Sequence, residues 1–260
     1  MKIVLIGSGN IATHLGKAIL KLEQHQLIQV YSKTLANAEA LANVLSVPAI
    51  ADLADLQTDA DLYILAVSDA AIASVSDSLP KDLKGIVIHC SGATPMEHLH
   101  NNLQHGVIYP IQSFSKTVDV DLRLVPLGVE GSSDSVESKL TAFAKDLSNQ
   151  VFSCSTEQRL AIHVAAVFAN NFTNALFQVS YELMEQHGLS FDLIRPIILE
   201  TAEKVQKQVP ALVQTGPALR NDEITMQRHL QFISSNPDWQ LIYQQISALI
   251  TKRKGKKGEN

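Results

Sequence analysis

The sequence predicts an α/β region with a doubly wound parallel sheet, followed by an all-helical region. Short apolar runs alternate with helical segments over residues 1–154, whereas residues 155–254 carry long helical patterns and no strand patterns. The first apolar run leads directly into a glycine-containing turn and a helix. These observations predict one domain over residues 1–154, a helical domain over residues 155–254, and a disordered tail over residues 255–260.

The first strand and helix enclose a turn with the spacing G-x-G-x-x-A. Residues 2–6 are apolar and β-branched, and residues 11–22 have helical periodicity. Gly7 permits the tight turn, Gly9 allows close approach of a pyrophosphate, and Ala12 lets the helix lie near the strand. The helix N-terminus offers unpaired N–H groups to phosphates. We expect a dinucleotide to bind at Gly7, Ser8, Gly9, Asn10, Ile11 and Ala12; the alternative is a turn without nucleotide.

The end of the second predicted strand, residues 27–31, bears on which dinucleotide binds. An acidic residue at this place binds the 2′-OH of NAD, whereas cations and hydroxyl groups suit the 2′-phosphate of NADP. Ser32, Lys33 and Thr34 follow the strand, and no carboxylate occurs between Leu27 and Asn37. The sequence therefore favours NADP over NAD. The alternative is that Lys33 is an exposed turn lysine.

The remaining elements of the first domain follow in alternation. The fourth strand, residues 61–67, should place Val67, Ser68 and Asp69 under the cofactor, because the carboxyl ends of parallel strands line the ligand crevice. Asp69 could cap the next helix. We expect the other strands at residues 47–49, 85–90, 107–109, 124–129 and 150–153, and helices at residues 36–45, 70–79, 95–103 and 135–147.

The helical domain begins at Ser155, a candidate N-cap. Its first helix, residues 157–187, places His163, Asn170 and Asn174 on one face. These polar groups argue against a membrane span, although the helix is largely apolar. Further helices are expected at residues 191–209, 223–233 and 238–253, with a loop over residues 214–222.

Composition narrows the class of protein. Hydrophobic residues make up 46% and charged residues 18%, which is ordinary for a globular protein. A net charge of −5, with no basic stripe before the tail, argues against a nucleic-acid binder. Cys90 and Cys154 lie far apart and outside any metal-ligand spacing. We therefore expect a cytoplasmic protein with reduced cysteines, no metal site and no signal peptide.

Several polar residues could carry chemistry. His163 can transfer a proton near neutral pH, and Asn170 or Asn171 could orient a substrate. His89, Ser91 and Gly92 follow a strand and could meet the substrate or the nicotinamide. Arg220 could bind a carboxylate or phosphate. The alternatives are a core histidine, hydrogen bonds between helices, a serine that caps a turn, and an ion pair of Arg220 with Asp222 or Glu223. We expect His229 to be structural.

Taken together, these motifs give a family resemblance. They are GSGNIA (7–12), AVSD (66–69), HCSGA (89–93), YPIQSF (109–114), ANN (169–171) and TGPALRND (215–222), with His163 and His229. The chain resembles a family of NADP oxidoreductases of unassigned substrate, in which a Rossmann-like domain precedes a helical domain. More distantly it is similar to pyrroline-5-carboxylate reductase, ketopantoate reductase, and the 6-phosphogluconate and β-hydroxyacid dehydrogenases.

The resemblance implies NADP in the first domain, a substrate in the interdomain cleft and a homodimer formed through the helical domain. Many of the distant relatives use a Lys and an Asn on the first long helix of that domain. This chain has no lysine between Glu157 and His187, so His163 and an asparagine would take those parts.

Two functions follow from these expectations. The first is hydride transfer between NADP(H) and a small, anionic carbonyl, hydroxy-acid or imine compound, with His163, Asn171 and Ser91 as catalytic residues. His89, Gly92, Asn170 and Arg220 would bind the substrate. The alternative is a non-catalytic sensor that binds NADP(H). The absence of H-E-x-x-H, G-x-S-x-G and Walker motifs argues against a hydrolase or a kinase.

Overall fold

The computed structural model describes residues 1–99, 102 and 104–255. The chain divides into two compact units, Met1–Phe172 and Thr173–Asn260. This division falls later in the chain than the predicted boundary after residue 154, because the first turns of the long helix are bonded to the sheet of the first unit. Of the predicted tail, residues 256–260 lie outside the described residues, and Gly255 ends the last helix.

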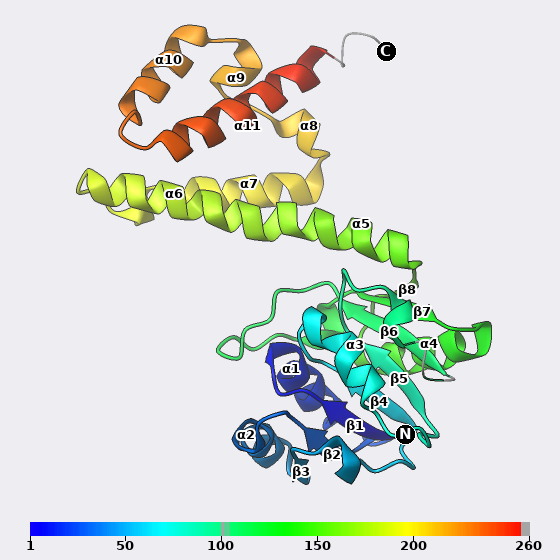
Figure 1. Ribbon diagram of the computed structural model, residues 1–260. Helices are drawn as coiled ribbons and strands as arrows, with labels where there is room; N and C mark the ends of the chain where they lie inside the picture. The colour runs from blue at the N-terminus through cyan, green and yellow to red at the C-terminus, as the bar shows by residue number, and fades with distance from the viewer. Residues whose placement is uncertain (100–101, 103, 256–260) are drawn as a thin grey trace. The chain divides into compact units, whose positions relative to one another are not determined.

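The first unit contains an eight-stranded sheet in the order β3-β2-β1-β4-β5-β6-β7-β8 (Figure 1). All neighbouring strands are parallel except β6 and β7. The predicted doubly wound sheet is confirmed, with an antiparallel reversal that was not predicted. The strands are β1 (Lys2–Ile6), β2 (Gln26–Tyr31), β3 (Ala49–Ile50), β4 (Leu62–Leu65), β5 (Ile86–His89), β6 (His105–Pro110), β7 (Leu127–Gly131) and β8 (Val151–Ser153).

Apolar side chains cover both faces of the sheet. Alternate residues of β1 enter two different clusters: Ile3 and Leu5 lie in one, and Val4 and Ile6 lie in the other. The first cluster includes residues of α1 (Asn10–Ile19), α2 (Leu35–Leu45) and α4 (Asp134–Leu147), and the second includes Ile72 of α3 (Asp69–Asp77). Burial on both faces explains why these strands read as continuous apolar runs.

The long predicted helix is present, but it is not uniformly α-helical. It consists of α5 (Thr156–Ala166), the π-helical segment η4 (Val167–Phe172) and α6 (Thr173–Gln186). Ser155 is its N-cap and forms a capping box with Gln158, as predicted. A π-helical turn takes up about one extra residue. We therefore expect Asn171, rather than Asn170, to lie two turns beyond His163 on the same face.

The second unit consists of short helices and of α6. They are η5 (Phe191–Leu193), α7 (Arg195–Lys207), α8 (Pro210–Val213), α9 (Pro217–Arg220), α10 (Glu223–Phe232) and α11 (Pro237–Gly255). The predicted helix over residues 191–209 is broken before α7, where Pro196 occupies the first turn. The predicted loop over residues 214–222 contains α9. In the first unit, the predicted helix over residues 95–103 is a single 3₁₀ turn, η2 (Met96–Leu99); residues 100, 101 and 103 lie outside the described residues.

The continuous helix Thr156–Gln186 is long and apolar enough to cross a bilayer by length and composition, with a mean hydropathy of 1.3 in its most apolar window. Such a test also selects helices of water-soluble proteins. This helix carries His163, Asn170 and Asn171, and its first turn is tied to the sheet by Arg159.

Candidate active site

The glycine-containing turn lies at the point where the strand order reverses. Gly7 has a φ of +121°, and its N–H donates to the Tyr31 carbonyl at 2.8 Å. A Cβ at Gly7 would lie 2.3 Å from the carbonyl oxygen of Ala66, directly after β4. Only glycine fits this conformation and this approach. In doubly wound sheets, ligands bind in the crevice at such a reversal.

The space beside this turn fits a pyrophosphate. A Cβ at Gly9 would meet no atom within 4 Å, so the backbone here is open to a ligand. Gly9 is the N-cap of α1 and supplies no side-chain hydrogen bond to the first N–H groups of the helix. A pocket of about 340 Å³ lies here. It brings predicted residues that follow β1 and β4 together with a loop after β6: Gly9, Asn10, Ile11, Ala66, Val67, Ser68, Gln112 and Phe114.

The loop after β6 is bonded to α1, and this contact was not predicted. Asn10 Nδ2 donates to the Phe114 carbonyl at 2.9 Å, and His14 Nε2 lies 2.9 Å from the Ser115 carbonyl oxygen. The His14 ring also lies 4.9 Å from the Phe114 ring, centroid to centroid. These bonds hold one wall of the pocket. The contact joins residues about a hundred positions apart in the chain, so no local pattern could indicate it.

Hydroxyl groups and one lysine follow β2. Ser8 and Ser32 join the two predicted segments through a 2.9 Å hydrogen bond between their hydroxyls. Lys33 and Thr34 are exposed. Thr34 is the N-cap of α2, but its side chain makes no capping hydrogen bond. The sequence predicts Asp69 as the N-cap of α3, but the N-cap is Ser68, whose backbone is extended. Asp69 is the first helical residue, where a carboxylate is favourable.

Tyr109, His163 and Gly92 form a second cluster in the first unit. The Tyr109 hydroxyl lies 3.2 Å from His163 Nδ1. A Cβ at Gly92 would lie 2.6 Å from that nitrogen and 2.7 Å from Cζ of Tyr109, so the pair needs glycine at this position. Tyr109 is buried, and burial raises the pKa of its hydroxyl. Tyr109 begins the YPIQSF motif, and nothing else in the sequence indicates a role for it.

Arg159 ties this cluster together and was also missed. Its side chain is fully buried, and its guanidinium is 3.0 Å from the Glu130 carboxylate. It also donates to the carbonyls of Ser91 and Thr94 at 2.9 and 2.8 Å. The other oxygen of Glu130 accepts from the backbone and the hydroxyl of Thr156. One signal was available, since Arg159 is a charged residue four positions before His163 on a mostly apolar helix.

His89 and Ser91 are buried beside Arg159. Ser91 Oγ accepts from the N–H groups of Ala93 and Thr94, which is the capping role considered as the alternative. His89 is fully buried, and its Nδ1 accepts from the Ser91 N–H at 3.2 Å. Burial, reinforced by the charge of Arg159, lowers the pKa of His89 to about 3. His89 is therefore neutral near pH 7 and supports the Ser91 loop from within the protein.

The other predicted residues are placed as follows. Asn170 and Asn171 are exposed on η4 in the first unit. Arg220 is exposed at the end of α9 in the second unit, and it forms no ion pair with any residue that the structure describes. The Asp222 carboxylate accepts from Thr225 instead, which lowers the pKa of Asp222. His229 is bonded to the Tyr243 hydroxyl at 2.9 Å, in keeping with a structural role.

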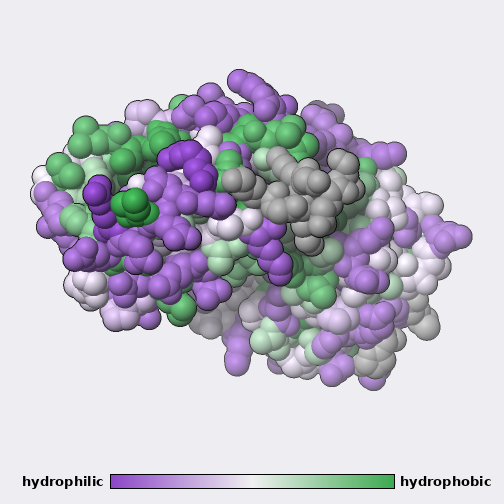
Figure 2. Space-filling model, turned by 90° about the horizontal axis from the view of Figure 1, so that it is seen from above, coloured by the Kyte–Doolittle hydropathy of each residue, from purple (hydrophilic) through white to green (hydrophobic). Residues whose placement is uncertain are grey.

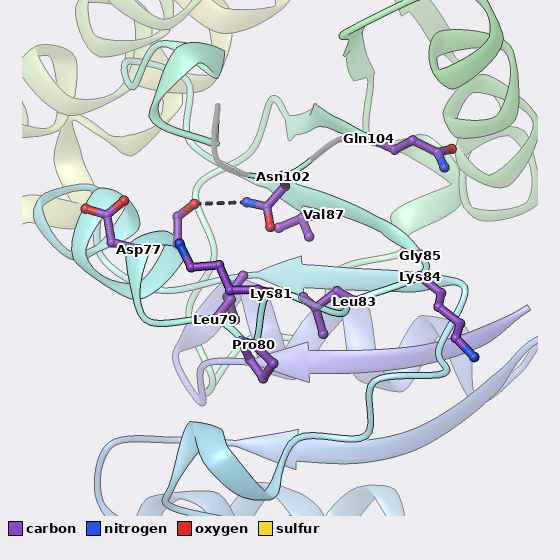
Figure 3. A pocket seen from close by; sticks show the side chains of 11 residues that line it. Asp77, Leu79, Pro80, Lys81, Leu83, Lys84, Gly85, Val87, Asn102 and Gln104 are labelled. Atoms are coloured by element: carbon purple, nitrogen blue, oxygen red, sulfur yellow. Dashed lines mark hydrogen bonds between the residues drawn. The ribbon is translucent and has the colours of Figure 1, made fainter.

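A different pocket, of about 270 Å³, lies at the amino ends of β5 and β6 (Figure 3). Lys81 and Lys84 line it, and Asn102 donates to Ser76 Oγ beside it. The predicted dinucleotide site lies at the carboxyl ends of the strands. The pocket in Figure 3 therefore does not belong to the dinucleotide site.

Two family models match the chain. Residues 2–91 match the family described as NADP oxidoreductase, coenzyme F420-dependent, and residues 125–250 match a domain of unknown function, DUF2520. No match was found among curated proteins.

Solved structures match over nearly the whole chain. A candidate NADP oxidoreductase, BF3122 from Bacteroides fragilis, is 36% identical, with a TM-score of 0.86 over 96% of this chain and 98% of its own. A 1-pyrroline-5-carboxylate reductase from Streptococcus pyogenes is 16% identical (TM-score 0.64, 97% and 98% covered). An imine reductase from Myxococcus stipitatus in complex with NADP⁺ is also 16% identical (TM-score 0.66, 100% and 95% covered). The last two similarities show the fold.

Proposed function

Because the chain belongs to the NADP oxidoreductase family, as its motifs had indicated, we propose that it transfers a hydride between NADP(H) and a small, anionic carbonyl, hydroxy-acid or imine compound. The observation that carries this proposal is the Tyr109–His163 pair. A titratable ring, held in a fixed position by a buried hydroxyl, lies in the same unit as a dinucleotide turn. Reduction of a C=O or C=N bond needs a proton as well as a hydride.

NADP is the cofactor of this family, in agreement with the prediction from the sequence. When bound, the reduced form supplies the hydride. Gly7, Gly9 and the first N–H groups of α1 would hold the pyrophosphate, and Val67, Ser68 and Asp69 would lie beneath the dinucleotide. Ser32, Lys33 and Thr34 would bind the 2′-phosphate. The Ser8–Ser32 hydrogen bond supports this arrangement because it fixes the two segments together.

His163 would pass a proton to the substrate oxygen or nitrogen while the adjacent carbon gains the hydride. Asn171, on the wider turn of η4, would orient the reacting group with Asn170 nearby. Ser91 has used its lone pairs on the Ala93 and Thr94 N–H groups, but it keeps its hydroxyl hydrogen for a ligand. Arg220, with no ion pair among the described residues, would supply positive charge for an anionic substrate.

We assign His89 and Gly92 a different part from the predicted contact with substrate. His89 is fully buried, and Gly92 leaves room for Tyr109 and His163. Both would shape the Ser91 loop.

A binding titration and a substrate panel test this function. NADPH fluorescence should change on binding, and NADPH should be oxidised with a member of a panel of keto acids, aldehydes and cyclic imines. His163→Gln should lower turnover by about 10²- to 10⁴-fold and leave NADPH binding intact. His105→Gln, which alters a half-buried histidine of the same unit, is the control. Binding without oxidation of any panel member would contradict the enzyme and favour the sensor.

We further propose that the protein is a cytoplasmic homodimer formed through its helical unit. Ala218 is the only residue of that unit buried among those that the structure describes. Large apolar side chains are exposed instead: Ile197, Leu212 and Phe232 have exposed fractions of 60%, 69% and 62%. Figure 2 shows hydrophobic side chains, in green, interspersed with hydrophilic ones on the surface seen from above. Monomeric proteins rarely leave so much apolar surface uncovered.

A groove of about 540 Å³ crosses this unit and is lined by Leu176, Phe232, Trp239, Ile242 and Ile246, among others. Phe232→Asp should shift the protein toward monomers in sedimentation experiments. Gln227→Asp, on an exposed position of the same helix, should not. A wild-type monomer at micromolar concentration would contradict the dimer. The buried, unpaired Cys90 and Cys154 fit a reducing compartment.

A further inference from the structure

We propose that Tyr109 is a positioning residue and proton relay for His163: it keeps the neutral ring protonated on Nε2 and passes its own proton to Nδ1 as the Nε2 proton leaves. This inference rests on the proposed function, because the departing proton goes to the substrate. It assigns a role to a residue outside the predicted catalytic set.

The hydrogen bond between Tyr109 and His163 decides which ring nitrogen is free. The phenol oxygen lies 3.2 Å from Nδ1. A phenol has a single hydrogen to donate, and a neutral imidazole has one donor nitrogen and one acceptor nitrogen. Among the described residues, Nδ1 is the only hydrogen-bond partner of this hydroxyl. If Tyr109 accepted from Nδ1, the O–H of this 8% exposed residue would find no acceptor among the described residues, which is costly. Tyr109 therefore donates, and the ring proton sits on Nε2.

The surroundings of Tyr109 keep it in the donating form. Its side chain is 8% exposed, and burial raises the pKa of the hydroxyl. Asp69 acts in the same direction, and the positive charge of Arg159 opposes both. The phenol is thus protonated near pH 7. It nevertheless remains a stronger acid than the alcohol or amine that the reaction forms.

Two features hold the pair at this distance. Gly92 has no side chain, and any Cβ there would lie within 2.8 Å of atoms in both rings. Arg159 precedes His163 by four residues, so both lie on one face of α5. Arg159 bonds the carbonyls of Ser91 and Thr94, on either side of Gly92. The helix that carries His163 is thereby fixed to the loop that faces the pair.

Two protons move in this step. The Nε2–H bond breaks and its proton joins the substrate oxygen or nitrogen, while the adjacent carbon receives the hydride. The Tyr109 O–H bond breaks and its proton joins Nδ1, so that the imidazole stays neutral throughout. As Nε2 then takes a proton from water, Nδ1 returns its proton to the Tyr109 phenolate, which restores the starting form of the pair. Without Tyr109, the neutral ring would become an imidazolate, which is a far less stable anion.

Nitrogen-15 NMR of the histidine rings tests the inference without any substrate. The His163 signals are assigned by their loss in His163→Gln and are read at a pH where the ring is neutral. We expect an unprotonated Nδ1 and a protonated Nε2 in the wild-type protein. Tyr109→Phe should change the ratio of the two forms by about two- to tenfold, as loss of a neutral hydrogen bond does. A proton on Nδ1 in the wild-type protein, or an unchanged ratio in Tyr109→Phe, would overturn the inference.

Tyr63→Phe is the matched control. Tyr63 is also buried in the sheet, but its hydroxyl bonds Gln57 and Ala60. The Tyr63→Phe variant should be less stable than the wild-type protein, but its His163 signals should be unchanged. With a substrate in hand, Tyr109→Phe should lower kcat by about 10²-fold and leave KM nearly unchanged. Should no substrate be found, the proposed function fails while the ring protonation still stands as measured; an active enzyme with Nδ1 protonated would refute the relay alone.

Discussion

Replacement of Gly92 by alanine should disturb the Tyr109–His163 pair and leave the proposed cofactor site intact. A methyl group at Gly92 would lie 2.6 Å from His163 Nδ1 and 2.7 Å from Tyr109 Cζ, well inside van der Waals contact. Neither neighbour can retreat easily. Tyr109 belongs to β6, and His163 follows Arg159, which is bonded to the Ser91 loop. Overpacking of this kind costs about 1–3 kcal/mol.

The assay is urea unfolding followed by circular dichroism, combined with an NADPH titration. The Gly92→Ala variant should unfold at lower urea, with a free energy of unfolding reduced by about 1–3 kcal/mol. Its affinity for NADPH should stay within about twofold of wild type. Turnover should fall by more than the loss of folded protein accounts for, since the Tyr109–His163 distance must increase.

Gly9→Ala is the reciprocal variant. A Cβ at Gly9 meets nothing within 4 Å, so stability should fall only by the roughly 1 kcal/mol or less that separates glycine from alanine at an N-cap. The methyl group would occupy the space that the pyrophosphate needs, so NADPH affinity should fall strongly. If Gly92→Ala proved as stable as wild type, or if Gly9→Ala bound NADPH normally, the steric reasoning at that glycine would be refuted.

Two further predictions concern charged residues. Lys33→Asp should lower the affinity for NADPH by about 10- to 100-fold and the affinity for NADH much less, since a charge-assisted hydrogen bond contributes about 1.5–3 kcal/mol. Equal losses of affinity for the two dinucleotides in fluorescence titrations would disprove the 2′-phosphate assignment. Arg159→Met should lower the free energy of unfolding by about 3–5 kcal/mol, because the Glu130 carboxylate would lose its buried partner. The double variant Arg159→Met, Glu130→Leu should recover part of that loss, and no recovery would show that the carbonyls of Ser91 and Thr94 dominate.

The sheet could be predicted from the sequence because the patterns that indicate its strands and its first turn lie within short segments of the chain. Each strand is buried on both faces and reads as an apolar run, and the spacing of glycines specifies the first turn. The direction of a strand depends instead on the connection that precedes it. The reversal between β6 and β7 depends on a connection that includes residues 111–126, whose hydropathy does not reveal the direction of the next strand. A π-helical turn is equally hidden, because its residues suit an α-helix too.

The candidate site was only partly predictable, for a similar reason. Gly7 and Gly9 have roles that follow from the turn itself. The roles of Tyr109 and Arg159 follow from partners in distant parts of the chain: Tyr109 meets His163, and Arg159 meets Glu130. A tyrosine near the end of a strand has no special signature in the sequence before its partner is known. Arg159 could have been noticed, since a charged residue on the same face of a helix as His163 needs a partner.

His89 gives the folded protein a specific sensitivity to acid. Its pKa is lowered from an ordinary 6.5 to about 3, by burial and by the charge of Arg159. Between these values, the unfolded chain binds a proton at His89 and the folded chain does not. The contribution of His89 to the free energy of unfolding is therefore fully present above pH 6.5, and it falls by about 1.4 kcal/mol per pH unit as the pH drops toward 3.

His89→Asn removes this titration and leaves a side-chain oxygen that can accept the Ser91 N–H. Its free energy of unfolding should lie below that of wild type at pH 7.5. The difference should shrink steadily between pH 6.5 and pH 5, because the wild-type protein alone loses stability at this position. The other eight of the nine histidines are common to both proteins and cancel in the comparison. The measurement is urea unfolding at each pH. If the difference in free energy of unfolding between the two proteins stayed constant over this range, His89 would take up its proton in the folded protein as readily as in the unfolded chain. Burial and the charge of Arg159 would then not lower its pKa.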